Sequence, residues 1–474
     1  MVLNTQRINR QVQAPVLLAL LGAVYVCVSL ATGQMFPSLF GIFLVIGLWL
    51  ITREPYDVML LWVLISPAFD WWGGIELGSL PNITPHRLLL GVTIVSLLLR
   101  RSISDNPVQE TQRKPEVVLL ALFLAYSAMV IFTRINSFEE AFGWFQTTLL
   151  PALAFLIPFG LITNEQQVLR LFRWMPLIVV YLFLPALYEQ ITKTSFLSGG
   201  WLWGVGMGYR GFRSSSLSGE ASTLSNMGLL LIPFMIYRFS KDRQRLIARV
   251  WDYLLLAFAG GIVLCSYFRS AMIALAFVLL LAVIGVPEMR KTLLPSLLIM
   301  AAVLVWQWNN IAETDLFQQR MLNPLTGIER LENVNTQMER LLANPLFGEG
   351  GSEALIISGT TTVSHNFYMS LALHTGLIGL VLYLAPIAVI VLRTGKWLRS
   401  STSGGLSSRK RDLVIVLWLS VNGMMINGMF MDLRFFGTAL ALFWFILGMI
   451  ARITAWPQSD CDVSARPSSA PRVP

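Results

Sequence analysis

Long apolar runs alternate with short polar segments along most of this chain of 474 residues. Most runs hold roughly 16 to 20 residues, close to the about 20 that an α-helix needs to cross a bilayer core of about 30 Å. We therefore predict an all-α polytopic membrane protein with about 14 transmembrane helices and a lower bound of about 12. The predicted helices cover residues 15–33, 36–52, 57–70, 87–100, 116–133, 144–162, 175–190, 222–237, 252–267, 271–286, 293–309, 367–392, 413–430 and 435–451.

Composition agrees with this pattern, since 55% of the residues are hydrophobic, only 13% are charged, and the mean hydropathy is +0.65. A water-soluble domain usually carries about 25% charged residues. Arg7 and Arg10 precede the first apolar run, but no small-residue cleavage site follows where that run ends near Thr32. We expect this first run to be retained as a membrane span.

Basic residues indicate how the predicted spans are oriented. With the N-terminus placed in the cytoplasm and the sides alternating, 25 of the 35 Lys and Arg residues fall in cytoplasmic segments and 10 on the outer side. This asymmetry is the positive-inside bias of membrane proteins, and it predicts cytoplasmic N- and C-termini. The formal charge of +9 is then explained by contacts with anionic lipid headgroups, so we expect no nucleic-acid partner.

Two outer segments are long enough to carry function, at about 191–221 and 310–366. Glycine and serine are frequent in the first, which favours irregular backbone. The second contains a polar helical stretch before Pro345, with apolar residues spaced for a helix on the membrane surface or on the bundle. We interpret this stripe as packing rather than as a binding groove; it comprises Ile328, Leu331, Val334, Met338, Leu341 and Leu342.

Domain organisation follows from the same pattern. Residues 1–452 are predicted to form one transmembrane bundle that includes both outer segments, the second as a large, partly helical periplasmic loop. Residues 453–474 are rich in Pro, Ser and Ala and are predicted to form a disordered cytoplasmic tail. The three cysteines share no outer segment, so neither a disulfide framework nor a cysteine metal site is expected; they are Cys27, Cys265 and Cys461.

Arginine and histidine supply the candidate chemistry. Arg269 lies between two short apolar runs, in an expected hairpin at the outer surface, either as an interfacial anchor or as an anion ligand. His365 stands where the second outer segment meets an apolar run. Its ordinary pKa of about 6.5 suits a general base, and a helix-capping or interfacial histidine is the structural alternative. His86 suits an interfacial position, and we expect His374 to be buried and hydrogen-bonded.

Four motifs follow one another along the chain: FRSSSLSGEAS, SYFRSA, NPLFGEG and HNFYMSLALHTGLIGL. In this order they resemble the O-antigen ligase and polysaccharide polymerase superfamily of bacterial envelope enzymes. The resemblance covers roughly residues 201–384, and the rest of the chain is similar only in hydropathy. The most specific combination is NPLFGEG followed by HNFY and GLIGL.

This resemblance implies a glycosyltransferase of the bacterial inner membrane, in exopolysaccharide or lipopolysaccharide biosynthesis, with a periplasmic active site. Members of the family transfer a glycan from undecaprenyl diphosphate to a hydroxyl group. The acceptor is the lipid A core for ligases and another lipid-linked repeat for polymerases. The implied partners are this donor, a glycan or lipid A-core acceptor, the lipid bilayer and other envelope polysaccharide assembly proteins. No cofactor is implied.

Carried over residue by residue, the family histidine corresponds to His365, the expected catalytic base. The two family arginines correspond to Arg213 and Arg269, which are expected to bind the diphosphate. Arg210 competes with Arg213 for the first match, because the sequence GYRGFR offers two arginines. Candidate supporting residues are Asn366, Glu220, Arg330 and Tyr368.

The expected mechanism is a single displacement with inversion and without a metal ion. Arginine offers planar, bidentate and permanently charged donors to the departing diphosphate, so no divalent cation is needed. Glu220 is a candidate hydrogen-bond partner or nucleophile, although we favour a structural role. The sequence departs from the family at Val334, where an aromatic residue is usual, and at His374, where an acidic residue is usual. Both departures bear on how the acceptor is bound.

Two other classes of protein remain as alternatives. A multi-spanning transporter or flippase of lipid-linked glycans would share the apolar pattern, but coupled transporters usually keep carboxylates near the membrane midplane. A structural subunit gives no reason for the basic candidates to gather on one side. The acidic residues that bear on this choice all lie near the ends of predicted spans; they are Asp57, Asp70, Glu189 and Asp432.

Overall fold

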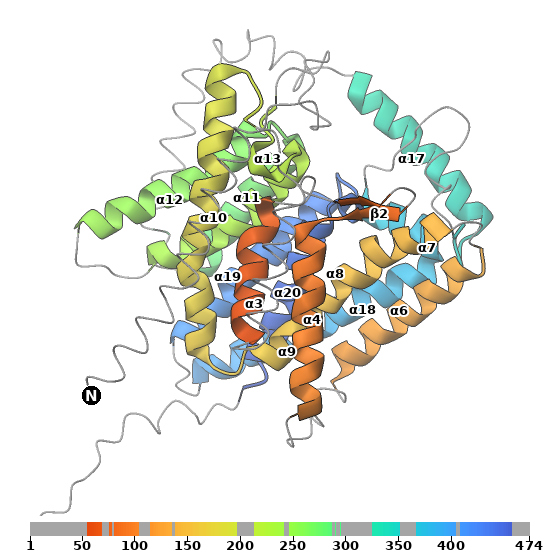
Figure 1. Ribbon diagram of the computed structural model, residues 1–474, viewed down its shortest axis with the longest axis horizontal. Helices are drawn as coiled ribbons and strands as arrows, with labels where there is room; N and C mark the ends of the chain where they lie inside the picture. The colour runs from red at the N-terminus through yellow and green to blue at the C-terminus, as the bar shows by residue number, and fades with distance from the viewer. Residues whose placement is uncertain are drawn as a thin grey trace, which may run out of the picture.

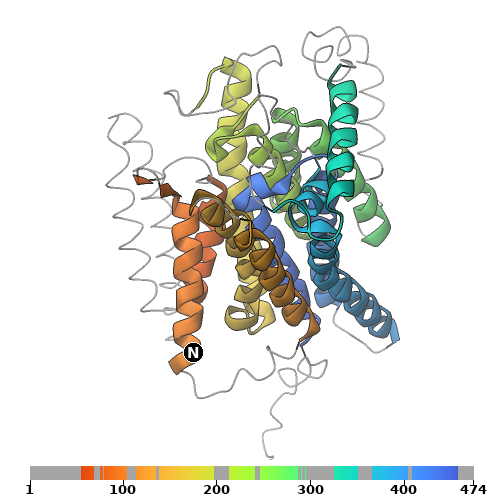
Figure 2. The same ribbon diagram turned by 90° about the vertical axis from the view of Figure 1, so that its right-hand side faces the viewer.

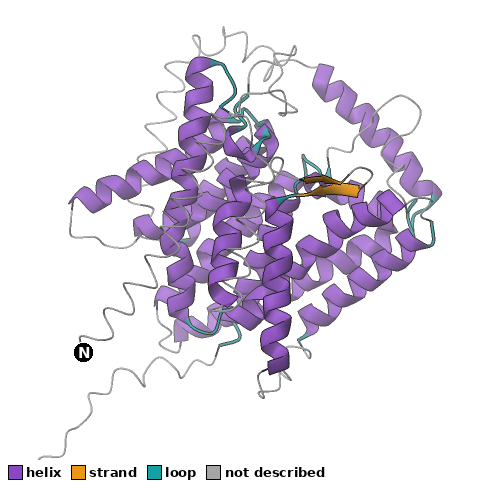
Figure 3. Ribbon diagram, in the orientation of Figure 1, coloured by secondary structure: helices purple, strands orange, loops and turns teal. Residues whose placement is uncertain are grey.

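The computed structural model describes residues 55–68, 75–77, 80–103, 114–134, 138–196, 213–240, 246–286, 290, 294, 325–350, 366–403 and 408–456. Within these ranges the chain forms helices, one short β-hairpin and the loops and turns that connect them (Figures 1 and 3). The predicted helices at 15–33 and 36–52 lie outside the described residues, and the one at 293–309 lies almost entirely outside them.

Each of the other eleven predicted ranges coincides with helical structure. The elements in chain order are α3 (Pro55–Ile65), η1 (Ser66–Ala68), α4 (Pro85–Ile103), α6 (Pro115–Phe132), α7 (Phe138–Trp144), η2 (Phe145–Leu149), α8 (Leu150–Leu153), η3 (Ala154–Leu156), α9 (Ile157–Leu161), α10 (Glu165–Thr192), η4 (Ser216–Ser218), α11 (Ala221–Ser240), α12 (Leu246–Cys265), α13 (Arg269–Gly285), α17 (Leu325–Ala343), α18 (Phe367–Ser403), α19 (Ser408–Gly428), η7 (Leu433–Phe435) and α20 (Gly437–Ile453).

Five helical segments in the described part of the chain are long and apolar enough to cross a membrane. They are Pro115–Phe132, Ala141–Leu161, Glu165–Thr192, Ile247–Cys265 and Phe367–Arg399. Four shorter apolar helices accompany them: Pro55–Ala68, Pro85–Leu98, Arg269–Gly285 and Gly437–Ile453. The protein is thus a multi-spanning membrane protein, while the count of about 14 spans stays a prediction.

Three differences from the predicted elements have local causes. Helix α10 begins at Glu165, ten residues before the predicted range 175–190, because Asn164 caps it by accepting a hydrogen bond from the Gln167 N–H at 3.0 Å. The predicted span 144–162 contains short α, π and 3₁₀ turns, with prolines opening α8 and α9. The all-α prediction omitted an antiparallel hairpin of β1 (Ile75–Leu77) and β2 (Leu80–Ile83), strands too short for a hydropathy pattern to reveal.

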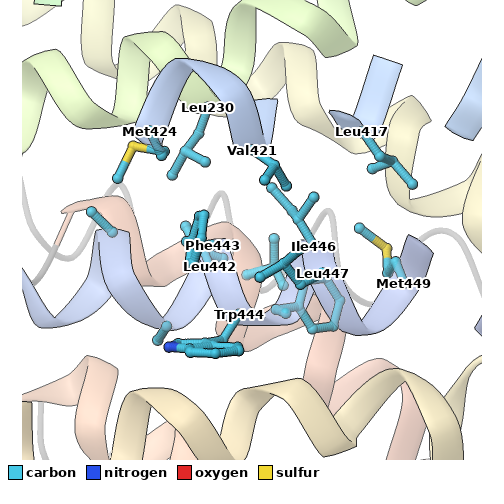
Figure 4. Close-up of a cluster of buried hydrophobic side chains, with 14 of the residues drawn as sticks. Leu230, Leu417, Val421, Met424, Leu442, Phe443, Trp444, Ile446, Leu447 and Met449 are labelled. Atoms are coloured by element: carbon cyan, nitrogen blue, oxygen red, sulfur yellow. The ribbon is translucent and has the colours of Figure 1, made fainter. Parts of the chain in front are cut away.

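Helix α20 lies at the centre of the bundle. Fifteen of its 17 residues are buried, which is typical of a helix that is apolar on every side. Trp444 packs edge-on against Tyr383 of α18, with ring centroids 5.2 Å apart, and against Phe155 at 6.0 Å. Figure 4 shows neighbouring side chains of α20 facing Leu230 of α11 and Val421 of α19. The helices that carry the candidate site are therefore arranged around one apolar core.

Charged contacts separate into two groups, which we call the outer and inner ends after the predicted sides. At the outer end Arg434 pairs with Asp432 at 2.8 Å. At the inner end Arg170 pairs with Asp57 at 3.0 Å. Four further ion pairs among the described residues also join residues of a single predicted side: Arg340 with Glu349 outside, and Arg238 with Asp252, Arg393 with Glu116 and Arg409 with Glu165 inside. The alternation of sides inferred from the sequence thus fits these contacts, whereas which side faces the cytoplasm stays a prediction.

Candidate functional site

The segment that begins at Arg213 packs against the outer ends of α10 and α12. The backbone N–H of Ser214 donates to the carbonyl oxygen of Cys265 at 3.2 Å. The side-chain amide of Gln190 in α10 donates to the same carbonyl at 2.8 Å and to the Ser214 hydroxyl at 2.9 Å. The segment is therefore fixed beside the turn between α12 and α13 (Figure 1).

Glu189, in the last turn of α10, binds the same segment through backbone donors. Its Oε2 accepts hydrogen bonds from the N–H groups of Ser215 and Ser216, both at 2.8 Å, and its Oε1 accepts one from Phe196 N–H at 3.0 Å. Ser215 is in the right-handed region and Ser216, with φ of 52°, in the left-handed region, a pair that directs successive N–H groups to one anion. Because Glu189 is fully buried, these donors replace the water that its charge has lost.

Phe268 contacts Arg213 and directly precedes Arg269 in the chain. The guanidinium carbon of Arg213 lies 4.9 Å from the centre of the Phe268 ring, within the range of a cation–π interaction. Phe268 is the N-cap residue of α13, and Arg269 is the first residue of that helix. Both arginines are half-buried. The structure thus brings Arg213 to the residue next to Arg269, although 56 positions separate the two in the sequence.

The turn before Arg269 has an unusual backbone. Tyr267 has a φ of 50°, the left-handed region that residues other than glycine seldom adopt. Its N–H donates to the carbonyl of Leu264 at 3.0 Å. Burial raises the pKa of the Tyr267 phenol, so the hydroxyl stays protonated at neutral pH. Backbone strain of this kind is concentrated at functional sites. Here the strained residue lies two positions before Arg269, the first residue of α13.

Glu220 stands at the N-terminal end of α11. Its carbonyl accepts hydrogen bonds from Leu224 N–H at 2.9 Å and from the Ser218 hydroxyl at 3.2 Å. Gly219, with φ of 79°, makes the turn between η4 and this residue. The backbone of Glu220 therefore starts α11, and its half-buried side chain lies in the loop that also contains Arg213.

Asn366 and Tyr368 have structural contacts at the start of α18. The Asn366 side-chain oxygen accepts hydrogen bonds from Tyr368 N–H at 2.9 Å and Met369 N–H at 3.0 Å, the geometry of a helix N-cap. The Tyr368 hydroxyl donates to the Met425 carbonyl of α19 at 2.9 Å. These two residues fix the first turn of α18, directly after His365.

A buried ion pair supports that turn from the neighbouring loop. Arg434 of η7 pairs with Asp432 at 2.8 Å and also donates to the Ser370 hydroxyl. The two side chains are 11% and 1% exposed. Ser370 is four residues after Asn366 and therefore lies one turn further along α18. The loop before α20 is thus joined to the start of α18.

The NPLFGEG turn and the HTGLIGL segment bind each other. Helix α18 breaks at Gly376, which has φ of 69° and ψ of 179°. Leu377 N–H donates to the Pro345 carbonyl at 2.8 Å, and a Cβ atom on Gly376 would lie 1.9 Å from the Leu346 carbonyl oxygen. A Cβ on Gly348 would in turn lie 2.5 Å from the Gly376 nitrogen. Only glycine fits at both positions, which gives a physical reason for this pair of motifs.

His374 lies at this contact and is buried, as predicted. Its Nδ1 lies 2.9 Å from the Gly350 carbonyl oxygen, an acceptor only, so Nδ1 carries the proton. Glu349 N–H donates to the Leu373 carbonyl at 2.7 Å. The adjoining charges are Arg340, which pairs with Glu349, and Arg134, which donates to the Gly348 carbonyl. The end of α17 is thus held on α18 and α6.

The structure describes some of the candidate residues predicted from the sequence and not others. His365 and Arg210 lie outside the described residues, and Arg330 lies in α17, where its side chain is not described. Among the described candidates, Arg213 lies beside the turn that contains Arg269. Glu220 belongs to the same loop as Arg213. The candidates at the start of α18, Asn366 and Tyr368, make the structural contacts given above.

The sequence reasoning missed the residues that fix these elements. Glu189 and Asp432 were noted only as acidic residues near span ends. Glu189 binds backbone N–H groups, which a hydropathy pattern does not reveal. Asp432 binds Arg434, and the spacing Asp-x-Arg at 432–434 indicates this pair. Among the described residues, no cluster of three or more His, Cys, Asp and Glu side chains is placed to hold a metal ion.

Fold and site together define a multi-spanning membrane protein with basic residues fixed in loops at one end of its helices. A family model described as O-antigen ligase matches residues 254–384. The matched range includes α13 with Arg269, the NPLFGEG turn, His365 and the start of α18, whereas Arg210, Arg213 and Glu220 precede it. The resemblance to the O-antigen ligase superfamily, predicted from the motifs, is thereby confirmed. No curated protein matches the chain.

Proposed function

We propose that this protein is a membrane glycosyltransferase that moves a glycan from undecaprenyl diphosphate to an acceptor hydroxyl at the periplasmic face. The O-antigen ligase match supports glycan transfer of the ligase or polymerase type. The observation that carries the proposal is the contact of Arg213 with Phe268, which places one guanidinium beside the residue that precedes Arg269. Two arginines at the outer end of adjoining elements suit a diphosphate with charges on both phosphates.

The arginines stabilise the departing diphosphate. Breaking the bond between the anomeric carbon and the diphosphate leaves negative charge on its oxygens, and preorganised donors lower that barrier. Preorganisation comes from the frame around Arg213, which Glu189 and Gln190 hold by hydrogen bonds of 2.8 to 3.0 Å. Arg210 is the alternative donor from the same loop, and Glu220 supports the loop.

His365 accepts the proton of the acceptor hydroxyl. It directly precedes Asn366, so the N-cap of α18 fixes the chain beside it. Attack of the acceptor oxygen on the anomeric carbon breaks the bond to diphosphate in one step and inverts the configuration at that carbon. Arg330 and Tyr368 are supporting residues, of which Tyr368 anchors the first turn of α18 to α19.

Coupled transport is disfavoured by where the buried carboxylates lie. In the described part of the chain Glu116 and Glu189 lie within four residues of a helix end, and Asp432 lies in a loop. Asp252 lies six residues after the start of α12 and pairs with Arg238. Each of these groups binds a backbone or arginine partner, and three of the four lie near or beyond a helix end, whereas coupled transporters keep carboxylates for a coupling ion near the midplane.

The test measures glycan transfer by variants in a bacterial inner membrane. Both termini are expected to lie in the cytoplasm. His365→Ala and Arg269→Ala should each accumulate lipid-linked glycan while the protein level in the membrane stays unchanged. Arg173→Ala, which removes an exposed arginine at the inner end of α10, is the matched control and should transfer normally. Normal transfer by both site variants refutes the mechanism.

Deletion of the protein distinguishes the two kinds of transferase. Full-length glycan chains that stay on the lipid carrier identify a ligase, which uses the lipid A core as acceptor. Single unpolymerised repeats identify a polymerase, which uses another lipid-linked glycan. Unchanged envelope glycans contradict both.

A further inference from the structure

Five apolar side chains near the end of α17 are exposed, although α17 is not among the candidate spans. Leu342 is 69% exposed, and Leu346 and Phe347 in the following turn are 53% and 48% exposed. We call these three residues the apolar tip. Val334 and Met338, 39% and 42% exposed, continue the same stripe toward the start of the helix. Of the two positions predicted for this stripe, the membrane surface or the bundle, these residues do not take the second.

A neighbouring face of α17 makes the contact with the bundle. Gln337 and Leu341 are buried, and Leu341 packs with Ala372 and Leu373 of α18. Because successive residues turn by about 100° around a helix, Leu342 lies to one side of the contact made by Leu341 and is exposed. The apolar tip is thus exposed at the surface, next to the end of α6, where Arg134 donates to the Gly348 carbonyl. Figures 1 and 2 both show α17 at the periphery of the described helices.

Its position along α6 shows how deep the apolar tip lies. The Tyr126 hydroxyl of α6 donates to the Leu346 carbonyl at 3.1 Å. Tyr126 is six residues before Phe132, the last residue of this candidate span, which is about 9 Å along the helix axis. Phe132 packs edge-on against Trp144 at 5.7 Å, a pair typical of the aromatic belt at a membrane surface. The turn therefore lies at the level of that belt, between Tyr126, which binds Leu346, and Arg134, which binds Gly348 just beyond the end of α6.

The turn joins a surface of α6 that is already apolar and exposed. Leu122 and Met129, on either side of Tyr126 in the sequence, are 51% and 52% exposed. In a membrane-spanning helix such residues face lipid. Leu346, whose carbonyl binds Tyr126, adds exposed apolar surface beside α6, so the lipid that faces α6 also suits the apolar tip.

The backbone carbonyl groups of the turn have hydrogen-bond donors within the protein, as an apolar solvent requires. Irregular backbone at membrane depth is tolerated only where its polar groups have partners within the protein. The Pro345 carbonyl accepts from Leu377 N–H at 2.8 Å, and the Leu346 carbonyl accepts from Tyr126. Arg134 donates to the Gly348 carbonyl. In a turn exposed to water, these carbonyl groups could bind water and would not require donors within the protein.

We propose that the apolar tip inserts into the outer leaflet of the bilayer, where phospholipid acyl chains cover Leu342, Leu346 and Phe347. Helix α17 then leaves the membrane from this anchored end and carries its polar residues into the aqueous phase. The second outer segment is thereby attached both to the lipid and to α18 at one point, the end of α17. This inference does not depend on the chemistry of the transferred glycan.

Spin labels on single cysteines test the insertion in the full-length protein. The three native cysteines are replaced by alanine, and labels are placed at Leu342 or Phe347, with Thr336 on the exposed polar face of α17 as the control. The protein is reconstituted in vesicles of phosphatidylethanolamine and phosphatidylglycerol. Labels at the tip should collide more with oxygen than with a water-soluble nickel chelate, and the label at Thr336 should show the reverse.

Two results overturn the proposal. Equal access of the nickel chelate to positions 342, 347 and 336 places the tip in water. Exclusion of both oxygen and nickel places it under protein, from a second copy or from another segment of this chain. Unlabelled variants give a second measurement: Phe347→Asp should increase hydrogen exchange across α17 severalfold, whereas Thr336→Asp should leave it unchanged. Unchanged exchange in Phe347→Asp also contradicts insertion.

Discussion

The carboxylate of Glu189 accepts a hydrogen bond from the backbone N–H of Ser216 at 2.8 Å, and through it α10 determines where Arg213 lies. Ser215 donates to the same oxygen, so two successive N–H groups share one charge. The loop that carries Arg213 is thus positioned by an acidic residue that has no direct role in the proposed reaction.

Replacement of Glu189 should loosen this loop. Glu189→Gln turns an acceptor-only group into one whose NH₂ opposes backbone donors, and unsatisfied buried groups cost about 1 to 3 kcal/mol. We expect faster amide exchange at Ser215 and Ser216 and a lower rate of glycan transfer. Wild-type exchange at these amides in Glu189→Gln would show that the carboxylate does not hold the loop.

Arg213 and Arg210 can be separated by substitution. Loss of one donor to a departing oxyanion lowers the rate about 10²- to 10³-fold, so Arg213→Ala should reduce transfer by this much. Arg213→Lys should also be impaired, because lysine keeps the charge and loses the planar bidentate fork. Arg210→Ala is expected to be mild. Equal and mild effects at both positions would indicate that neither arginine binds phosphate.

Asn366 is expected to act through the helix it caps. Asn366→Ala removes an acceptor for the Tyr368 and Met369 N–H groups and should destabilise the protein by about 1 kcal/mol. Asn366→Asp retains the acceptor and should keep both stability and transfer. The measurement is thermal unfolding in detergent together with transfer in membranes. Loss of transfer in Asn366→Asp at unchanged stability contradicts a purely capping role.

Gly376 should tolerate no side chain. A Cβ at this position would lie 1.9 Å from the Leu346 carbonyl oxygen, and φ of 69° adds strain for any other residue. Gly376→Ala should therefore destabilise the protein by at least about 2 kcal/mol, measured by unfolding in detergent. Gly395→Ala is the matched control in the same helix, because nothing lies within 4 Å of its added Cβ. Equal stability of the two variants contradicts the packing of the turn on α18.

Much of the helix pattern could be read from the sequence, because a bilayer core selects for apolar segments of fixed length. The start of α10 was placed too late because four of its first six residues, from Glu165 to Arg170, are polar and resemble a loop. The break at Gly376 was missed for the opposite reason, since this glycine lies within an apolar run that resembles an unbroken span.

The candidate site was predictable only where residue type carries chemistry. Arg269 stood out because it lies between two short apolar runs, and Arg213 because it corresponds to a family arginine. The structure brings their segments together at Phe268. Glu189 did not stand out, because its function depends on backbone N–H groups of residues that follow it by 26 and 27 positions. Contacts of this kind have no signature in one sequence.

The attachment of Gly350 to His374 has a consequence for the residues between Gly350 and Asn366. Gly350 N–H donates to the His374 carbonyl at 3.1 Å, and Asn366 caps the same helix, so both ends of the intervening segment rest on α18. Because both contacts are made to one helix, the point where the chain leaves α18 after Gly350 and the point where it returns before Asn366 are fixed relative to each other.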